Sequence, residues 1–333
     1  MKKFFGKQLS VLLALILCVS MLPVAALAQV QPQAQSRKFI YMLGDSTMAD
    51  YNASRYPRYG WGQALPEILS PYATVVNKAI PGYSTRTAYY SDDMWGFVEP
   101  RLGEGDYLFI QFGHNDCNPK FDESNVAGEK WAPLTEIDET HEKYEYYEHT
   151  YYWYMDKFIE GAKAKGAIPI ILTSIPRIDS FAGGLKPAGW DYTAAPAKPG
   201  EDGYVDPVYI EYIAAAKQIA EDYDIQCIDM FELAKNHILT YETLEEARKL
   251  YMVFDKATEW PDCTESSSDV VHITHKGALE FARLVMNELK GNDHPLGDYL
   301  LPEGADPGFI DDFEWVPIRQ AKTATWYIKR ILL

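Results

Sequence analysis

The sequence predicts a flavodoxin-like three-layer α/β/α sandwich built on a five-stranded parallel sheet. Two observations predict it: five short apolar runs have the length and the β-branched or aromatic content of buried strands, and segments with helical spacing separate them. Alternation of this kind implies βαβ crossovers, with helices on both faces of the sheet. With 333 residues and 47% hydrophobic content, the chain is long enough to bury a sizeable core.

The predicted strands are continuous apolar runs, as expected where helices cover both faces of a sheet. They are FIYML from Phe39, TVV from Thr74, YLFIQF from Tyr107, IPIILTSI from Ile168 and IQCIDM from Ile225. The predicted helices span 61–69, 144–165, 208–223 and 274–289. Thr274 is a good N-cap residue and marks the start of the last helix.

The N-terminus has the features of an export signal. Lys2 and Lys3 precede an apolar run, and Ala26-Leu27-Ala28 forms a small-x-small cleavage site. A buried N-terminal helix is the alternative. We expect a signal peptide over 1–28 that is cleaved near Ala28, a linker over 29–37, one main domain over 38–290 and an extension of unknown role over 291–333, which makes the protein secreted.

The net charge limits the partners. The formal charge is −17, and loss of Lys2, Lys3 and Lys7 with the signal changes it to −20. Nucleic acid and anionic membranes are disfavoured by repulsion. After the signal, no apolar stretch approaches the roughly 20 residues of a membrane span. We therefore predict no nucleic acid and no membrane partner.

Two long insertions, at 117–142 and 177–206, follow predicted strands and contain Trp131 and Trp190. They are interpreted either as walls of a binding cleft or as solvated loops. Three cysteines remain after signal cleavage. Cys227 fits a small buried hydrophobe, whereas Cys117 and Cys263 are either bridged or free.

Polar, turn-forming residues follow three predicted strands, and ligands of such sheets collect at the carboxyl ends of the strands. The first strand ends in Gly44-Asp45-Ser46. A serine hydroxyl is a weak nucleophile that needs a base, a group that orients the base, and donors for the oxyanion. By itself, a Gly-Asp-Ser turn is more often a plain turn or a helix cap.

Asp269 and His272 are the candidate orienting group and base. They precede the helix that starts at Thr274, so we expect both on a loop, where three-residue spacing can direct them toward one serine. Alone, a histidine near a helix start is usually inert. His275 is the competing histidine, and it has no carboxylate at the same spacing.

Gly82 and Asn115 supply candidate oxyanion donors, a backbone amide and a side-chain amide, although each is ordinarily a turn residue. The sequence has no GxSxG elbow, no GxGxxG or Walker loop, no HExxH motif and no EF-hand loop. Metal and nucleotide chemistry therefore have no sequence support, and we predict no cofactor and no metal.

Four motifs in order resemble the four blocks of SGNH (GDSL-type) hydrolases. They are Gly44-Asp45-Ser46, Asn77 through Gly82-Tyr83-Ser84-Thr85-Arg86-Thr87, Gly113-His114-Asn115-Asp116 and Asp269-x-x-His272. The second and third look most like the rhamnogalacturonan acetylesterase group, and the similarity extends over about 39–289.

The resemblance implies an SGNH catalytic domain with Ser46 as nucleophile, His272 as base and Asp269 as its orienting group. It further implies Ser46 N–H, Gly82 N–H and Asn115 Nδ2 as oxyanion donors, and cofactor-free deacetylation of plant cell-wall polysaccharide. Asp45, Arg86, His114 and Trp131 are the candidates for substrate contact.

The substrate stays open between two polysaccharides. A polyuronate such as rhamnogalacturonan or pectin is repelled by the acidic chain unless Arg55, Arg58, Arg86 or Arg177 supplies local positive potential. Acetylated xylan is much less charged and fits equally well. A lipase or thioesterase with longer acyl chains and a non-catalytic polysaccharide-binding protein are the alternative functions.

Overall fold

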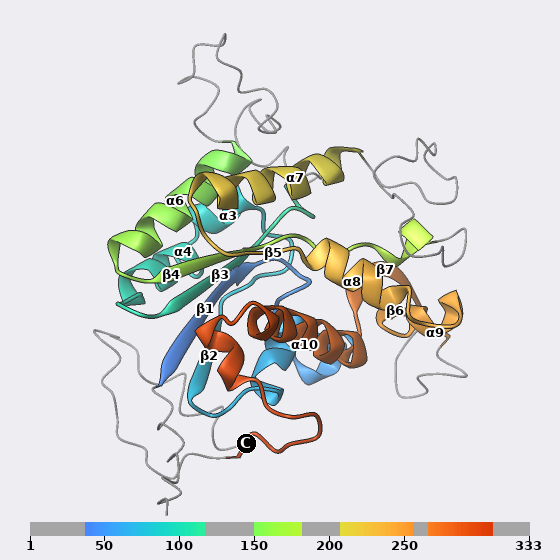
Figure 1. The fold of residues 1–333 in the computed structure, drawn as a ribbon. Helices are drawn as coiled ribbons and strands as arrows, with labels where there is room; N and C mark the ends of the chain where they lie inside the picture. Colours follow the sequence, from blue (N-terminus) through green and yellow to red (C-terminus); the bar gives the residue numbers. More distant parts are fainter. Residues whose placement is uncertain (1–36, 117–149, 182–206, 256–265, 309–333) are drawn as a thin grey trace, which may run out of the picture. The chain divides into compact units, whose positions relative to one another are not determined.

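The computed structural model of the chain describes residues 37–116, 150–181, 207–255 and 266–308. Its main feature is a five-stranded sheet in the order β2-β1-β3-β4-β5 (Figure 1), and every neighbouring pair is parallel. The strands are β1 (Lys38–Gly44), β2 (Ala73–Asn77), β3 (Tyr107–Gln111), β4 (Ile168–Leu172) and β5 (Cys227–Ile228). This is the flavodoxin-like order, so the predicted fold class is confirmed.

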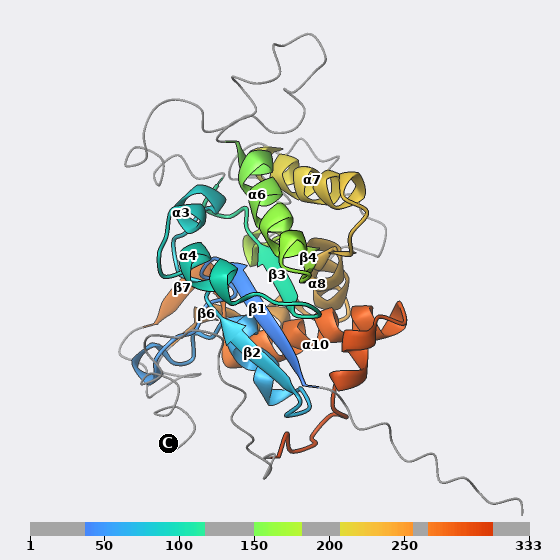
Figure 2. The same cartoon turned by 90° about the vertical axis from the view of Figure 1, so that its left-hand side faces the viewer.

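Successive side chains of the central strands enter two different cores. From β1, Ile40 and Met42 pack with one set of helices, whereas Tyr41 and Leu43 pack with another. The first set is α2 (Trp61–Ala64), α8 (Met230–Ile238) and α10 (His275–Gly291); the second is α3 (Thr85–Tyr89), α4 (Trp95–Val98), α6 (Tyr151–Ala164) and α7 (Pro207–Asp222). Figures 1 and 2 show these two layers on opposite faces of the sheet.

Local chemistry explains where elements are shorter than predicted. The helix expected over 61–69 is α-helical only to Ala64 and continues as the 3₁₀-helix η2 (Leu65–Glu67), because Pro66 has no N–H to donate. Strand β5 has two residues because Asp229 already caps α8, accepting from Glu232 N at 3.2 Å. The helix expected from residue 144 begins at Tyr151 with Thr150 as N-cap, and 144–149 lie outside the described residues.

A second, two-stranded sheet pairs β6 (Tyr251–Phe254) with β7 (Ser267–Ile273) in antiparallel fashion. The expectation that Asp269 and His272 lie on a loop is therefore wrong, since both belong to β7. Three positions apart on a regular strand, they would face opposite sides. The register shifts between Tyr251 and Val253, and this irregularity in the pairing allows a turn-like backbone at Asp269 within the strand.

The chain after α10 packs back on the same core. The 3₁₀-helix η7 (Pro295–Tyr299) buries Leu296 and Tyr299, and Leu300 forms an isolated bridge with Leu69. The predicted signal segment over 1–28, Trp131, Trp190, Cys117 and Cys263 lie outside the described residues. Among the helices that the structure describes, none combines the length and apolar character needed to cross a bilayer.

Candidate active site

Ser46 sits in a tight turn at the carboxyl end of β1. A side chain at Gly44 would place its Cβ 2.7 Å from Met48 Sδ and 3.1 Å from Gln111 O, so a larger residue would force Met48 and the backbone of β3 to shift. The Asp45 carboxylate closes the turn by accepting from Thr47 N at 2.9 Å and from Thr47 Oγ1 at 2.8 Å. Ser46 itself keeps 8% of its surface exposed. The turn therefore presents Ser46 at the edge of a buried layer.

Hydrogen bonds of the buried Gln111 and of Tyr51 hold the surroundings of this turn in place. Gln111, wholly buried on β3, accepts from Trp61 Nε1 at 2.7 Å and donates to Thr173 O at 3.0 Å. Tyr51 OH donates to Ser46 O at 2.7 Å. Polar groups buried in this way and satisfied by partners rigidify their surroundings. The position of Ser46 is thus set by β1, β3 and α2 together.

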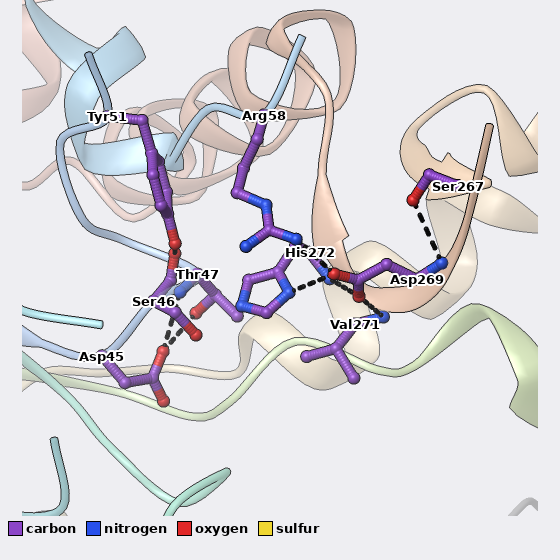
Figure 3. Close-up of polar contacts among 9 residues, drawn as sticks. All are labelled: Asp45, Ser46, Thr47, Tyr51, Arg58, Ser267, Asp269, Val271 and His272. Carbon is purple, nitrogen blue, oxygen red and sulfur yellow. Dashed lines mark hydrogen bonds and ion pairs between the residues drawn. The ribbon is translucent and has the colours of Figure 1, made fainter. Parts of the chain in front are cut away.

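His272 lies beside this turn with its orientation set by Asp269. Its Nδ1 is 2.6 Å from Asp269 Oδ2, and in Figure 3 the other side of the ring faces the Ser46 turn. With the proton on Nδ1, Nε2 is the basic nitrogen. Within the described part of the chain, His272 is hydrogen-bonded to Asp269 but not to Ser46. The structure brings the three predicted residues to one edge of the sheet.

The Asp269 carboxylate is fully engaged. Oδ1 accepts from Val271 N and His272 N, each at 3.1 Å, while Oδ2 also accepts from Arg58 Nη2 at 2.5 Å. Partial burial alone would raise the pKa of Asp269. The hydrogen bonds and charge of His272, with the two backbone N–H groups, outweigh it and hold that pKa well below its usual range. Asp269 is therefore an anion at neutral pH.

The candidate oxyanion donors follow the two strands that flank β1, since Gly82 comes after β2 and Asn115 comes after β3. Gly82 has φ of 83°, a left-handed conformation that favours glycine. Asn115 Nδ2 donates to Tyr83 O at 2.9 Å, which ties the end of β3 to the Gly82 loop. An amide nitrogen has two protons, so one remains for an oxyanion.

Asp116 strengthens the same connection. Its Oδ1 accepts from Thr85 N at 2.9 Å and from Thr85 Oγ1 at 2.6 Å. Asn115 and Asp116 therefore both hold the segment after Gly82 by hydrogen bonds, Asn115 at Tyr83 and Asp116 at Thr85. Burial is the main reason that the pKa of Asp116 is raised to about 6, because Oδ2 is buried without a hydrogen-bond partner in the described structure.

The four candidates for substrate contact differ in position. Asp45 is wholly buried and acts within the turn, which does not favour direct contact with a substrate. Arg86 lies partly exposed on α3, and His114 is partly buried at the end of β3, where burial lowers its pKa. Trp131 lies outside the described residues.

The competing histidine, His275, pairs with the carboxylate of Glu67. His275 Nε2 is 3.0 Å from Glu67 Oε2, and Tyr59 OH donates to Glu67 Oε1 at 2.9 Å. Sequence spacing gave no sign of this pair, because Glu67 is far away along the chain. The same reasoning missed the contact of Arg58 with Asp269, whose residues are 211 positions apart.

No group of three or more histidine, cysteine, aspartate or glutamate side chains suitable for a metal ion occurs within the described ranges. The chemistry that the described site supports is that of a serine, an imidazole and a carboxylate.

A flavodoxin-like parallel sheet with a Gly-Asp-Ser turn after β1 and an Asp-x-x-His pair beside it defines an ester hydrolase of the SGNH type. Residues 42–278 match the model of the GDSL-like lipase/acylhydrolase family, and the chain belongs to that family. It is therefore an enzyme, a carboxylic ester hydrolase, as the sequence predicts.

Relatives and a solved structure agree with this assignment. Rhamnogalacturonan acetylesterase RhgT of Bacillus subtilis is 30% identical over 264 residues, which cover 79% of this chain and 94% of the relative. Probable rhamnogalacturonan acetylesterase YesY of the same organism is 29% identical, with 79% and 98% covered. The crystal structure of B. subtilis protein YxiM aligns with a TM-score of 0.55 at 25% identity, covering 78% of this chain but 58% of that one. The resemblance to rhamnogalacturonan acetylesterases is thus confirmed.

Proposed function

We propose that this enzyme removes O-acetyl groups from plant cell-wall polysaccharide through an acetyl-serine intermediate. The observation that carries the proposal is the 2.6 Å hydrogen bond between His272 Nδ1 and Asp269 Oδ2, with the ring turned toward Ser46 (Figure 3). It leaves Nε2 as the nitrogen able to take the serine proton.

In the proposed reaction, Ser46 Oγ attacks the acetyl carbonyl carbon as His272 Nε2 takes its proton. The negative charge on the carbonyl oxygen is stabilised by Ser46 N–H, Gly82 N–H and Asn115 Nδ2. His272 then returns the proton to the sugar oxygen, which leaves as an alcohol. Water, activated by the same imidazole, attacks the acetyl-serine, and acetate departs with Ser46 regenerated.

Rhamnogalacturonan is the favoured substrate, because two relatives matched over most of their length are named rhamnogalacturonan acetylesterases. The chain carries a formal charge of −17, so a polyuronate needs local cations to approach. Of the four arginines predicted for this role, Arg55 and Arg177 are exposed and Arg86 on α3 is partly exposed, whereas Arg58 is paired with Asp269. Acetylated xylan needs no such help and is the competing substrate.

Replacement of Ser46 by alanine tests the nucleophile. We expect turnover of p-nitrophenyl acetate to fall by a factor on the order of 10⁵, because the remaining groups cannot form the acyl-enzyme. The thermal midpoint should change little, since alanine fits the space of serine. Ser54→Ala is the matched control on an exposed serine. Full activity of Ser46→Ala would refute the assignment.

Acetate release from defined acetylated fragments tests the substrate. We expect a higher kcat/KM for acetate release from rhamnogalacturonan fragments than from xylan fragments. The reverse ranking would make xylan the substrate. A chain-length series of p-nitrophenyl esters separates acetylesterases from lipases and thioesterases. A preference for octanoate over acetate would overturn the proposal, and glycan binding without any ester turnover would favour a binding protein.

We also propose that the enzyme acts outside the cell. The support is the sequence of the first 28 residues, with its basic start, apolar run and small-x-small site before Gln29. Expression of the full chain in a secreting host, followed by N-terminal sequencing of protein from the medium, should give a start near Gln29. Retention of the uncleaved chain inside the cell would contradict this.

A further inference from the structure

We propose that Arg58 is a positioning residue of this site, which holds the Asp269 carboxylate against His272 and sets the charge balance of that pair. The proposal rests on the proposed function, since it takes His272 as the base that serves Ser46. The observation behind it is a shared atom: Asp269 Oδ2 accepts from both Arg58 Nη2 and His272 Nδ1 (Figure 3).

The backbone of Arg58 is fixed to the strand that carries the pair. Arg58 forms an isolated antiparallel bridge with Thr274, directly after β7. On either side of it, Tyr59 N donates to Ile273 O at 3.0 Å and His275 N donates to Pro57 O at 2.9 Å. The guanidinium therefore reaches Asp269 from a segment that cannot move independently of His272.

The side chain of Arg58 is equally constrained. Its guanidinium lies 5.7 Å from the centre of the Tyr51 ring, the same tyrosine whose hydroxyl donates to Ser46 O. With 24% of its side chain exposed, Arg58 is shielded enough for its charge to act on its neighbours without full screening by water. Arg58 thus connects the Ser46 turn to the Asp269–His272 pair.

The electrostatic consequence has a definite sign. A carboxylate beside an imidazole favours the protonated ring, and a cation on the same carboxylate opposes it. Asp269 binds His272 and is shared with Arg58, His114 after β3 interacts with the His272 ring electrostatically, and Asp45 and Tyr51 after β1 lie in the same site (Figure 3). Arg58 is the member of this set whose charge is permanently positive.

Removal of the charge is the first experiment, done on the full-length enzyme with p-nitrophenyl acetate. In Arg58→Met, we expect the acid limb of kcat/KM to move upward by about half to one pH unit, because the imidazole protonates more readily. We also expect kcat at the pH optimum to fall about 10- to 100-fold, because the carboxylate is less well oriented. Arg248→Met, which removes an exposed arginine on α9 (Leu244–Arg248), is the matched control and should change neither.

Two further variants separate charge from orientation. Arg58→Lys keeps the charge without the planar fork, so the acid limb should stay within about 0.2 pH unit of wild type while kcat falls. Arg58→Gln keeps one possible donor without the charge. The acid limb of kcat/KM should therefore move as in Arg58→Met, whereas kcat should be higher than in Arg58→Met. These opposite patterns are not expected from a residue that only supports the fold.

A readout without turnover keeps the test independent of the substrate. In protein with ¹⁵N-labelled histidine, the midpoint of the His272 ring titration should rise in Arg58→Met by the same amount as the acid limb. An unmoved midpoint in a folded Arg58→Met, or an equal shift in Arg248→Met, overturns the proposal. If wild type lacks Ser46-dependent turnover, the proposed function fails instead, whatever the titration shows.

Discussion

The two halves of the candidate site are held in different ways. The sheet half, Ser46, Gly82 and Asn115, follows the parallel strands, and Ser46 and Asn115 are only 8% and 9% exposed. The paired-strand half, Arg58, Asp269 and His272, belongs to the small β6–β7 sheet and its neighbour, with side chains that are 24%, 24% and 23% exposed. Buried hydrogen bonds and packing fix the first half, whereas an ion pair and hydrogen bonds among partly exposed side chains fix the second.

This difference predicts how each half responds to change. Substitutions that remove a side-chain hydrogen bond of the sheet half, as at Asn115, should reduce both activity and stability, because the partner group is left buried without a hydrogen bond. Substitutions in the paired-strand half should reduce activity or shift its pH dependence at little cost in stability, because partly exposed charged groups contribute modestly to folding.

The largest expected effect within the paired-strand half belongs to His272. Replacement of His272 by alanine should lower kcat on p-nitrophenyl acetate by a factor of about 10³ or more, because no base remains for Ser46. The same replacement of His275, which pairs with Glu67, should cost less than about threefold. Thermal midpoints of both variants should lie close to wild type. Equal losses of activity in the two variants would break the distinction between the histidines.

A smaller loss is expected in the sheet half. Asn115→Ala removes a proposed oxyanion donor and should lower kcat about 10²- to 10³-fold with little change in KM. It also removes the 2.9 Å bond to Tyr83 O, so the free energy of unfolding should fall by about 1 kcal/mol. Urea unfolding and steady-state kinetics measure the two effects. A lower kcat without any loss of stability would contradict the contrast between the halves.

The last expected effect concerns stability alone and sharpens the contrast through the carboxyl group of Asp116. Its folded pKa of about 6 lies above the ordinary 3.8, so the folded state binds a proton more tightly than the unfolded state. The free energy of unfolding therefore falls as the pH rises from about 3.8 to about 6, and above pH 6 the contribution of the protonated Asp116 is lost.

Asp116→Asn keeps an acceptor for Thr85 and cannot ionise. Relative to wild type, it should be about equally stable at pH 3.5 and more stable at pH 7, by up to about 3 kcal/mol. Urea unfolding at the two pH values measures this difference. Glu303→Gln, an exposed carboxyl, is the control and should show no such dependence. A variant that is less stable at pH 7 than at pH 3.5, relative to wild type, would refute the prediction.

Sequence patterns predicted the sheet half well because its residues are defined locally. Continuous apolar runs specify buried parallel strands, and the polar residues of Gly44-Asp45-Ser46 and Gly113-His114-Asn115-Asp116 follow them directly. The strand order then brings those ends together. Element ends were less predictable, since Pro66 and the cap at Asp229 shortened elements that periodicity alone extends.

The paired-strand half was predicted in its residues but not in its structure. The spacing of Asp269 and His272 is visible in the sequence, whereas their placement on β7 depends on pairing with β6 in an irregular register. Pairing between strands is a long-range interaction that alternation in one segment does not reveal, and a loop was therefore expected where a strand occurs.

By itself, the sequence determined the order along the chain of the five strands of the parallel sheet and of the main helices, the four motifs and hence the family, because periodicity and short turns act within a few residues. Only the tertiary structure decided three contacts: Arg58 binds Asp269, Glu67 pairs with His275, and Asp116 accepts a hydrogen bond from Thr85. Each of these contacts joins side chains that are distant along the chain, and their energies depend on burial and geometry that exist only after folding.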